Sequence, residues 1–120
     1  AQAYEAIGCA HLRLDEYKAA EEYLLQAREL EPENPTILRN LSVLYSQTAR
    51  PEESLELLER SYEISPEDYL TQYALSSAYL FYGRRDEAKK ILFDLLQNEV
   101  PEQIRKPCEE RYLQLSVAWL

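Results

Sequence analysis

Glycine is scarce in this chain: only two of its 120 residues are glycine, and methionine is absent altogether. Because glycine supplies the left-handed backbone of tight turns and lets a backbone approach a phosphate closely, its scarcity argues against β-rich and phosphate-loop architectures. The segments between prolines are rich in Leu, Ala, Glu, Arg and Gln, which favour helices. The composition predicts an all-α protein of one domain, and its 46% apolar residues suffice for a continuous core.

Clusters of lysine and arginine are also missing. The net charge is −9, and residues 1–68 account for all of it. Nucleic-acid binding depends on clustered cations that displace counterions, so no nucleic-acid partner is expected. The acidity is compatible with a basic protein partner, although solubility is the simpler explanation.

Long apolar runs and paired cysteines are absent too. No uninterrupted apolar run approaches the roughly 20 residues that span a bilayer, so membrane insertion is not expected. Cys9 and Cys108 lie near opposite ends of the chain without CxxC spacing, which favours two free thiols and a cytoplasmic location. No secretory signal is visible. Because the chain lacks methionine, we expect it to have been processed or cut from a longer protein.

One pattern recurs along the chain at a constant period of about 34 residues, a length that is typical of repeat architectures. Each copy has a large residue, an apolar residue, a small residue and usually an aromatic ring: Tyr4, Ile7, Gly8 and His11; Leu38, Leu41, Ser42 and Tyr45; Gln72, Leu75, Ser76 and Tyr79. A fixed period of this kind indicates one supersecondary unit that is copied and stacked. Stacked units build an elongated surface rather than an enclosed reaction pocket, which favours protein binding over catalysis.

Apolar spacing and proline positions predict two helices in each unit. The expected helices span about 2–14, 16–31, 35–48, 51–64, 67–82, 85–97 and 107–119. Asn34 before Pro35 combines an N-cap side chain with proline at the first helical position, and we expect residues 65–68 to repeat this pattern. Gly83 is expected to end the fifth helix in a left-handed conformation.

The period falters between residues 98 and 106, where Pro101 and Pro107 are expected to bracket an irregular stretch or a single turn. The last helix reproduces the repeat pattern through Tyr112, Leu115, Ser116 and Trp119, which follow the third copy at a larger displacement than the repeat period. We interpret it as the first helix of a fourth unit, which follows a short insertion and whose partner helix is absent.

These residues resemble the tetratricopeptide repeat, whose pattern continues with Ala at positions 20 and 27, a large apolar residue at 24 and Pro at 32. The further matches are Ala20, Leu24, Ala27 and Pro32; Ser54, Leu58, Ser61 and Pro66; Ala88 and Leu92. The third unit departs from the pattern at Gln72, Leu95 and Val100. The resemblance implies a right-handed α-solenoid of seven helices in stacked antiparallel pairs. Its repeats are 1–34, 35–68 and 69–102, followed by a linker and a C-terminal capping or partial-repeat helix at 103–120.

Small residues are expected to set the distance between the two helices of each pair. Three pairs of small residues face each other in this register: Gly8 and Ala20, Ser42 and Ser54, Ser76 and Ala88. The large residues at positions 7, 11 and 24 of each unit are expected to fill the space between adjacent helix pairs.

The resemblance also implies a concave groove, lined by positions 2, 5, 9, 12 and 13 of every unit, that holds a peptide or protein segment. The candidate groove residues are Gln2, Glu5, Cys9, Leu12 and Arg13; Thr36, Arg39, Asn40, Val43, Ser46 and Gln47; Leu70, Tyr73, Ser77, Leu80 and Phe81.

Four apolar residues of the third unit have no structural role in the repeat pattern: Leu70, Tyr73, Leu80 and Phe81. Either they contact a ligand, or they pack against the seventh helix or are ordinary surface residues. Apolar and aromatic side chains rimmed by Arg and Asn are typical of an interface anchor. Our hypothesis is an extended or helical peptide whose apolar anchors lie toward Tyr73 and Phe81. Its polar end lies toward the arginine and asparagine residues of the first two units.

One subgroup of the family binds the acidic C-terminal tail of heat-shock chaperones through Lys, Asn and Arg at five defined positions. This chain has Glu5, Cys9, Asn40, Leu70 and Ala74 there. Only Asn40 matches, and Glu5 would repel a carboxylate. Binding of acidic chaperone tails is therefore not expected.

Catalysis is not expected either. His11, the only histidine, occupies an aromatic position of the repeat, where we expect it to be buried. Cys9 has no second histidine to activate it as a nucleophile. The glutamates of the second helices are expected to form a solvated outer surface: Glu21, Glu22, Glu52, Glu53, Glu56 and Glu59. His or Cys clusters for a metal are missing, so we predict no enzyme activity, no metal and no cofactor.

Two functional classes remain open. The first is an adaptor or co-chaperone-like module whose groove binds a segment of another protein. The second is a structural segment of a longer repeat scaffold, which acts through docking of its terminal helices or through self-association.

Overall fold

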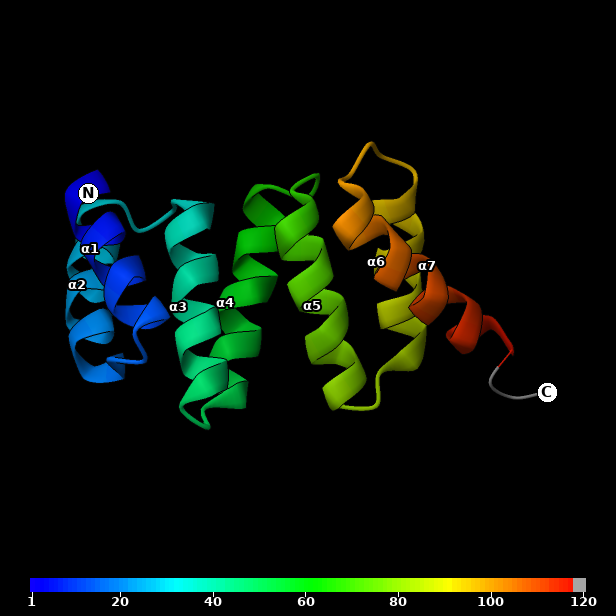
Figure 1. Cartoon of the computed structure of the whole chain (residues 1–120), viewed down its shortest axis with the longest axis horizontal. Coiled ribbons are helices and arrows are strands. Elements are labelled where there is room, and N and C mark those ends of the chain that lie inside the picture. Colours follow the sequence, from blue (N-terminus) through cyan, green and yellow to red (C-terminus); the bar gives the residue numbers. More distant parts are fainter. Residues whose placement is uncertain (118–120) are drawn as a thin grey trace. The chain divides into compact units, whose positions relative to one another are not determined.

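A computed structural model describes residues 1–117, and this part of the chain contains seven helices and no strand. The helices are α1 (Gln2–Arg13), α2 (Tyr17–Leu30), α3 (Pro35–Gln47), α4 (Pro51–Ile64), α5 (Tyr69–Phe81), α6 (Arg85–Leu96) and α7 (Glu102–Val117) (Figure 1). Trp119, which completes the predicted repeat pattern of the last helix, lies outside the described residues. Within residues 1–117, every helix is too short or too polar to form a transmembrane span.

The chain forms two compact units, residues 1–65 and 66–120. In the first unit α1 pairs with α2 and α3 with α4, and α2 also packs on α3. In the second unit α5 pairs with α6, and α6 packs on α7. Consecutive helices joined by short turns therefore make the helix pairs that the repeat period predicts.

Each unit has its own core. The core of the first unit consists of Ala20, Leu24, Ala27, Ile37, Leu38, Leu41, Leu44, Tyr45 and Leu57. In the second unit Leu92, Leu95 and Cys108 form a buried cluster, on which half-buried residues of α5 and α7 pack. The apolar stripes of the helices provide these residues, as amphipathic helices in a globular protein do.

Close approach of paired helices is visible at the small residues. Ser54 Oγ of α4 donates a hydrogen bond to the backbone oxygen of Ser42 in α3, at 2.8 Å. In the first pair, a Cβ added to Gly8 would lie 2.7 Å from Cγ of Leu24. Ser76 and Ala88 are buried as well. The predicted register is confirmed for Ser42 and Ser54, whereas the nearest atoms to Gly8 belong to Leu24 and not to Ala20.

Helix starts follow the capping chemistry of asparagine and aspartate. Asn34 Oδ1 accepts hydrogen bonds from the backbone N–H groups of Thr36 (3.0 Å) and Ile37 (3.5 Å), which confirms the predicted start of α3. The prediction for α5 is wrong by two residues. Its N-cap is Asp68, whose carboxylate accepts from the N–H of Leu70 at 3.1 Å. The Asp68 carboxylate satisfies a backbone N–H that would otherwise lack a partner at the start of the helix. The helix therefore begins at Tyr69 and not at the Ser–Pro pair upstream.

The turns inside the helix pairs repeat the same backbone geometry from one pair to the next. Asp15, Ala49 and Gly83 all adopt positive φ angles, of 59°, 59° and 74°. The following N–H closes each turn by donating to a backbone oxygen: Glu16 to His11 (2.9 Å), Arg50 to Tyr45 (2.9 Å) and Arg84 to Tyr79 (2.8 Å). The predicted left-handed conformation of Gly83 is confirmed, and the two other turns share it without a glycine.

Ala49→Gly is expected to raise the free energy of unfolding by about 0.5–1 kcal/mol. A residue with a Cβ costs roughly 1–2 kcal/mol in the left-handed region, and glycine removes this cost. Part of the gain is lost because glycine increases the conformational entropy of the unfolded chain. Urea denaturation followed by circular dichroism measures the change. The matched control Ala10→Gly, at an exposed position inside α1, should lower stability by about 0.5–1 kcal/mol. Equal or lower stability of Ala49→Gly would contradict the assigned backbone geometry.

The predicted start of the last helix is wrong. α7 begins at Glu102, and Pro107 lies inside it. The backbone oxygen of Pro101 accepts from the N–H groups of Ile104 and Arg105, both at 2.9 Å, which opens the helix well before Pro107. Pro107 removes one N–H donor, and burial of the neighbouring Cys108 in the second core offsets that loss.

The packing predicted around α1 is also wrong in part. His11 is not buried: its ring stacks on Tyr23 at 5.5 Å, and its Nδ1 lies 3.1 Å from a carboxylate oxygen of Glu16. Ile7 is 41% exposed and does not fill a space between helix pairs. α1 packs chiefly on α2, and Gly8 is the one residue of α1 that is fully buried in the described structure.

Candidate protein-binding surfaces

The candidate residues of the first unit lie on α1 and α3, and we call them the α1–α3 face. This face comprises Gln2, Glu5, Cys9, Leu12, Arg13, Thr36, Arg39, Asn40, Val43, Ser46 and Gln47. Asn40 Nδ2 donates a hydrogen bond to Glu5 Oε1 at 3.3 Å and so connects the two helices. Cys9 is half-buried, and Gln47 is exposed. The structure therefore brings the polar groups of the two helices together.

Charges of both signs surround the Cys9 thiol. Partial burial raises its pKa, and the carboxylate of Glu5 raises it further, while the guanidinium groups of Arg13 and Arg39 act in the opposite direction. The thiol therefore stays protonated at neutral pH and is a poor nucleophile.

Two residues of this face also have structural contacts. Leu12 is half-buried and packs against the core of the first unit. Thr36 is half-buried, and its N–H is held by the Asn34 cap. The chemistry of the α1–α3 face is therefore set by its polar side chains and not by Leu12 and Thr36.

The candidate residues of the second unit lie on α5, and most of them are accessible. Phe81 is 73% exposed, and its ring meets that of Tyr82 edge-on at 5.2 Å. Leu70 is 39% exposed. Tyr73 is half-buried and packs on the cluster that contains Leu92, so packing against neighbouring helices explains part of its presence. No packing role of that kind explains Phe81.

α7 adds residues that the sequence analysis did not include. Leu113 and Val117 are 62% and 53% exposed. When α7 is aligned with the repeat through Tyr112, they take the positions of Tyr73 and Ser77. The sequence could therefore have identified Leu113 and Val117, because the groove positions of the repeat, extended to α7, fall on these two residues.

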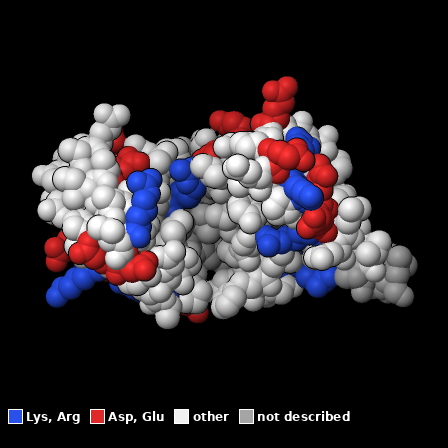
Figure 2. Space-filling view, in the orientation of Figure 1, with Lys and Arg blue, Asp and Glu red and all other residues white. Residues whose placement is uncertain are grey.

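An arginine of α7 reaches the same part of α5. Arg111 Nη1 donates a hydrogen bond to Ser77 Oγ at 2.9 Å, and its guanidinium lies 5.8 Å from the centre of the Tyr73 ring. We call the whole set the α5–α7 face: Leu70, Tyr73, Ser77, Leu80, Phe81, Arg111, Leu113 and Val117. In Figure 2, where α7 of the second unit is turned to the viewer, basic and acidic side chains lie among uncharged surface.

Ion pairs lie along α2 and α4 and in the turns beside them. Arg50 binds both carboxylate oxygens of Glu21, at 3.0 and 2.9 Å. Arg60 contacts Glu33 at 2.7 Å and Glu63 at 3.4 Å. Most of the glutamates predicted to form a solvated surface are exposed. Among residues 1–117, no three His, Cys, Asp or Glu side chains are grouped so that they could hold a metal ion.

Stacked helix pairs with a repeated small-residue contact and a repeated turn define a helical-repeat protein. Sequence profiles described as tetratricopeptide repeat match residues 1–34 and 49–106, which together make up well over half of the chain. The chain belongs to the tetratricopeptide repeat family.

Solved structures of low sequence identity share this fold. The TPR domain of Sgt2 from Aspergillus fumigatus is 21% identical, with a TM-score of 0.82; the match covers 98% of this chain and 80% of that one. The TPR2B domain of yeast Sti1 in a pHsp70 complex is 11% identical, with a TM-score of 0.82 and coverages of 96% and 94%.

A bacterial chaperone is similar as well. The type III secretion chaperone SycD of Yersinia enterocolitica, in complex with a peptide of the translocator YopD, is 10% identical, with a TM-score of 0.89 and coverages of 99% and 94%. No curated protein sequence is significantly similar to the chain. At these identities the likeness concerns the fold alone, and it confirms the predicted all-α fold class with its helix pairs.

Proposed function

We propose that this chain is a non-catalytic protein-interaction module that binds a segment of another protein on the inner faces of its first helices. Membership of the tetratricopeptide repeat family supports this, as do two similar structures, SycD in complex with a peptide of YopD and the Sti1 domain in a pHsp70 complex. The observation that carries the proposal is Phe81, a large aromatic side chain that is 73% exposed at a groove position of α5. Such anchors provide most of the free energy at protein interfaces.

The chemistry of the described residues supports binding rather than catalysis. His11 is engaged by Glu16 and Tyr23, the pKa of the Cys9 thiol is raised, and Cys108 is buried with a raised pKa as well. A nucleophile with a neighbouring base is not formed by these groups.

The two faces, one in each unit, differ in their chemistry. The α1–α3 face offers Arg13, Arg39 and the amide of Asn40, which suit polar groups. The α5–α7 face offers exposed apolar side chains, which suit apolar anchors. Asn40, the one residue shared with the chaperone-tail subgroup, already donates to Glu5. An acidic chaperone tail is therefore a poor ligand for the α1–α3 face.

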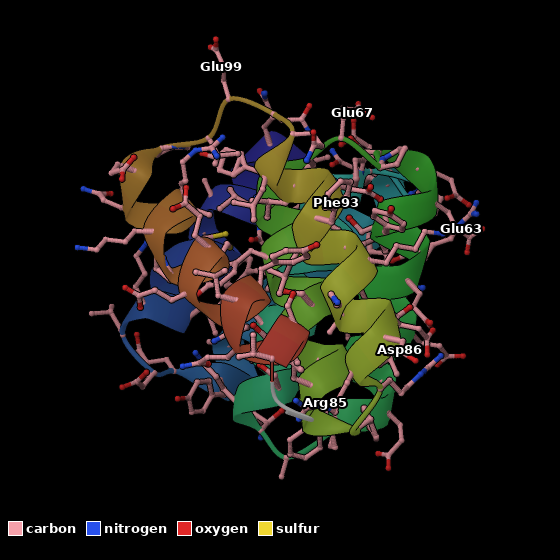
Figure 3. All side chains as sticks on the ribbon, turned by 90° about the vertical axis from the view of Figure 1, so that its right-hand side faces the viewer. Glu63, Glu67, Arg85, Asp86, Phe93 and Glu99 are labelled. Carbon is pink, nitrogen blue, oxygen red and sulfur yellow. The ribbon has the colours of Figure 1, made fainter. Side chains whose placement is uncertain are left out.

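Phe81→Ala tests the proposal against a matched control, Phe93→Ala. Phe93 is the other phenylalanine of the chain, is 49% exposed and lies on α6 (Figure 3). The probe is a synthetic peptide that was selected from a random phage-displayed library on the wild-type protein. Phe81→Ala should weaken its binding about tenfold or more, because removal of an interface anchor costs on the order of 2 kcal/mol.

Isothermal titration calorimetry measures both affinities. Phe93→Ala should leave the dissociation constant within about twofold of the wild type, since surface substitutions outside an interface change the free energy by roughly 0.5 kcal/mol or less. An unaltered affinity of Phe81→Ala would rule out the α5–α7 face as the binding surface.

One observation favours the second functional class, a structural segment of a longer repeat scaffold. Apolar side chains of the first helix pair are accessible, among them Ile7 at 41% and Leu30 at 60%. Accessible apolar side chains on a terminal helix pair can be covered by a further helix pair or by a second copy of the chain. Size-exclusion chromatography with light scattering distinguishes the classes, and a monomer at micromolar concentration would contradict self-association.

A further inference from the structure

Arg111 is the one basic side chain whose contacts join α5 to α7 in the described structure. The residue is partly buried, and its guanidinium makes a solvent-exposed hydrogen bond to the hydroxyl of Ser77 and lies over the ring of Tyr73. Neither contact neutralises its charge, and among residues 1–117 no carboxylate lies within ion-pair distance of it. The neighbouring Arg105 does have such a partner, Glu109, at 3.7 Å.

A guanidinium in this setting binds a carboxylate well. Arginine has five N–H donors in a planar fork, and Ser77 accepts from only one of its nitrogens. The remaining donors can hold a carboxylate through two parallel hydrogen bonds, which are shorter and stronger than neutral ones.

The two helices that Arg111 joins also carry accessible apolar side chains. Phe81 follows Ser77 by one helical turn on α5, and Leu113 and Val117 lie on α7. A ligand that fits these groups has large apolar residues near an acidic one. A basic segment would place its cations against Arg111, and a purely apolar one would leave that charge without a partner.

We infer that the α5–α7 face binds a peptide segment in which an Asp or Glu side chain pairs with Arg111 and neighbouring large apolar residues contact Phe81 and α7. This inference rests on the proposed function and adds the chemistry of the ligand. It places the anion of the ligand at Arg111 on α7. The hydroxyl of Ser77 positions the guanidinium through its hydrogen bond, and the ring of Tyr73 lies against it.

A charge-swap experiment tests the inference. The probe is the peptide enriched most strongly from a random phage-displayed library on the wild-type protein, made synthetically with Glu, Gln or Lys at its acidic position. Arg111→Glu should weaken binding of the Glu peptide about tenfold or more, and the Lys peptide should recover most of that loss on the variant. Arg111→Lys, which keeps the charge without the planar fork, should bind the Glu peptide with intermediate affinity.

Arg85→Glu is the matched control, because Arg85 is exposed at the first position of α6 (Figure 3) and the same charge change is made there. It should leave the affinity unchanged. Recovery of binding by the Lys peptide also shows that Arg111→Glu is folded. If Arg111→Glu does not fold, the affinity of Arg111→Lys for the Glu peptide still tests the inference.

Three results would overturn the inference. The first is equal binding of the Glu peptide to wild type and Arg111→Glu while Phe81→Ala still loses affinity, which would leave the proposed function intact. The second is a loss on Arg111→Glu without recovery by the Lys peptide, which would make Arg111 a residue that only holds α7. The third is enrichment of basic peptides or of none, and failure to enrich any peptide would also remove the proposed function.

Discussion

Leu41→Ala is expected to lower the free energy of unfolding by about 2–5 kcal/mol, because the truncation leaves a cavity in a close-packed core. Leu41 has no exposed surface and lies in the core of the first unit, together with buried residues of α2 and α4. The loss combines the transfer free energy of the removed methyl groups with the contacts that their neighbours lose. Chemical denaturation followed by far-ultraviolet circular dichroism measures it.

Leu14→Ala provides the comparison, since it deletes the same atoms at a side chain that is 69% exposed. Its effect should stay within about 0.5 kcal/mol, as at other surface positions. If Leu41→Ala also costs less than about 0.5 kcal/mol, Leu41 does not belong to the core and the helix packing of the first unit is wrong.

Ala20→Leu is expected to cost about 1–3 kcal/mol for the opposite reason, overpacking. Ala20 has no exposed surface, and one turn further along α2 the helix pair is tight, because a Cβ at Gly8 would lie 2.7 Å from Leu24 Cγ. A larger side chain at Ala20 must force apart α2 and its neighbours or adopt an unfavourable rotamer.

The melting temperature of Ala20→Leu should therefore fall, while Ala10→Leu should leave it nearly unchanged. Ala10 is exposed on α1, so the same added atoms meet solvent there. An unaltered melting temperature for Ala20→Leu would contradict the register in which small residues face each other.

Features set by neighbouring residues were predictable from the sequence. The Asn34 cap and the left-handed Gly83 follow from local backbone chemistry, and the structure has both. The repeat period also located the facing residues Ser42 and Ser54. The repeated stacking of the residue at position 16 on the ring at position 11 was not predicted. Arg50 lies 4.5 Å from the ring centre of Tyr45, and Arg84 lies 4.6 Å from that of Tyr79.

Features set by tertiary packing were not predictable in the same way. Pro107 was expected to start a helix because proline favours the first turn, yet burial of Cys108 keeps it inside α7. His11 occupies an aromatic position of the repeat, and its exposure depends on which helices cover α1. The sequence does not show that directly. In the candidate site, the exposed Phe81 was predicted, whereas Arg111 was missed since its role depends on the contact of α7 with α5.

Nuclear magnetic resonance chemical-shift mapping with the library-selected peptide tests the proposed binding surface most directly. The proposed function predicts that the amide signals that shift on titration belong to α1, α3, α5 and α7, with the largest changes near Ser77, Phe81 and Val117. Shifts concentrated instead on the outer helices α2, α4 and α6 would contradict it.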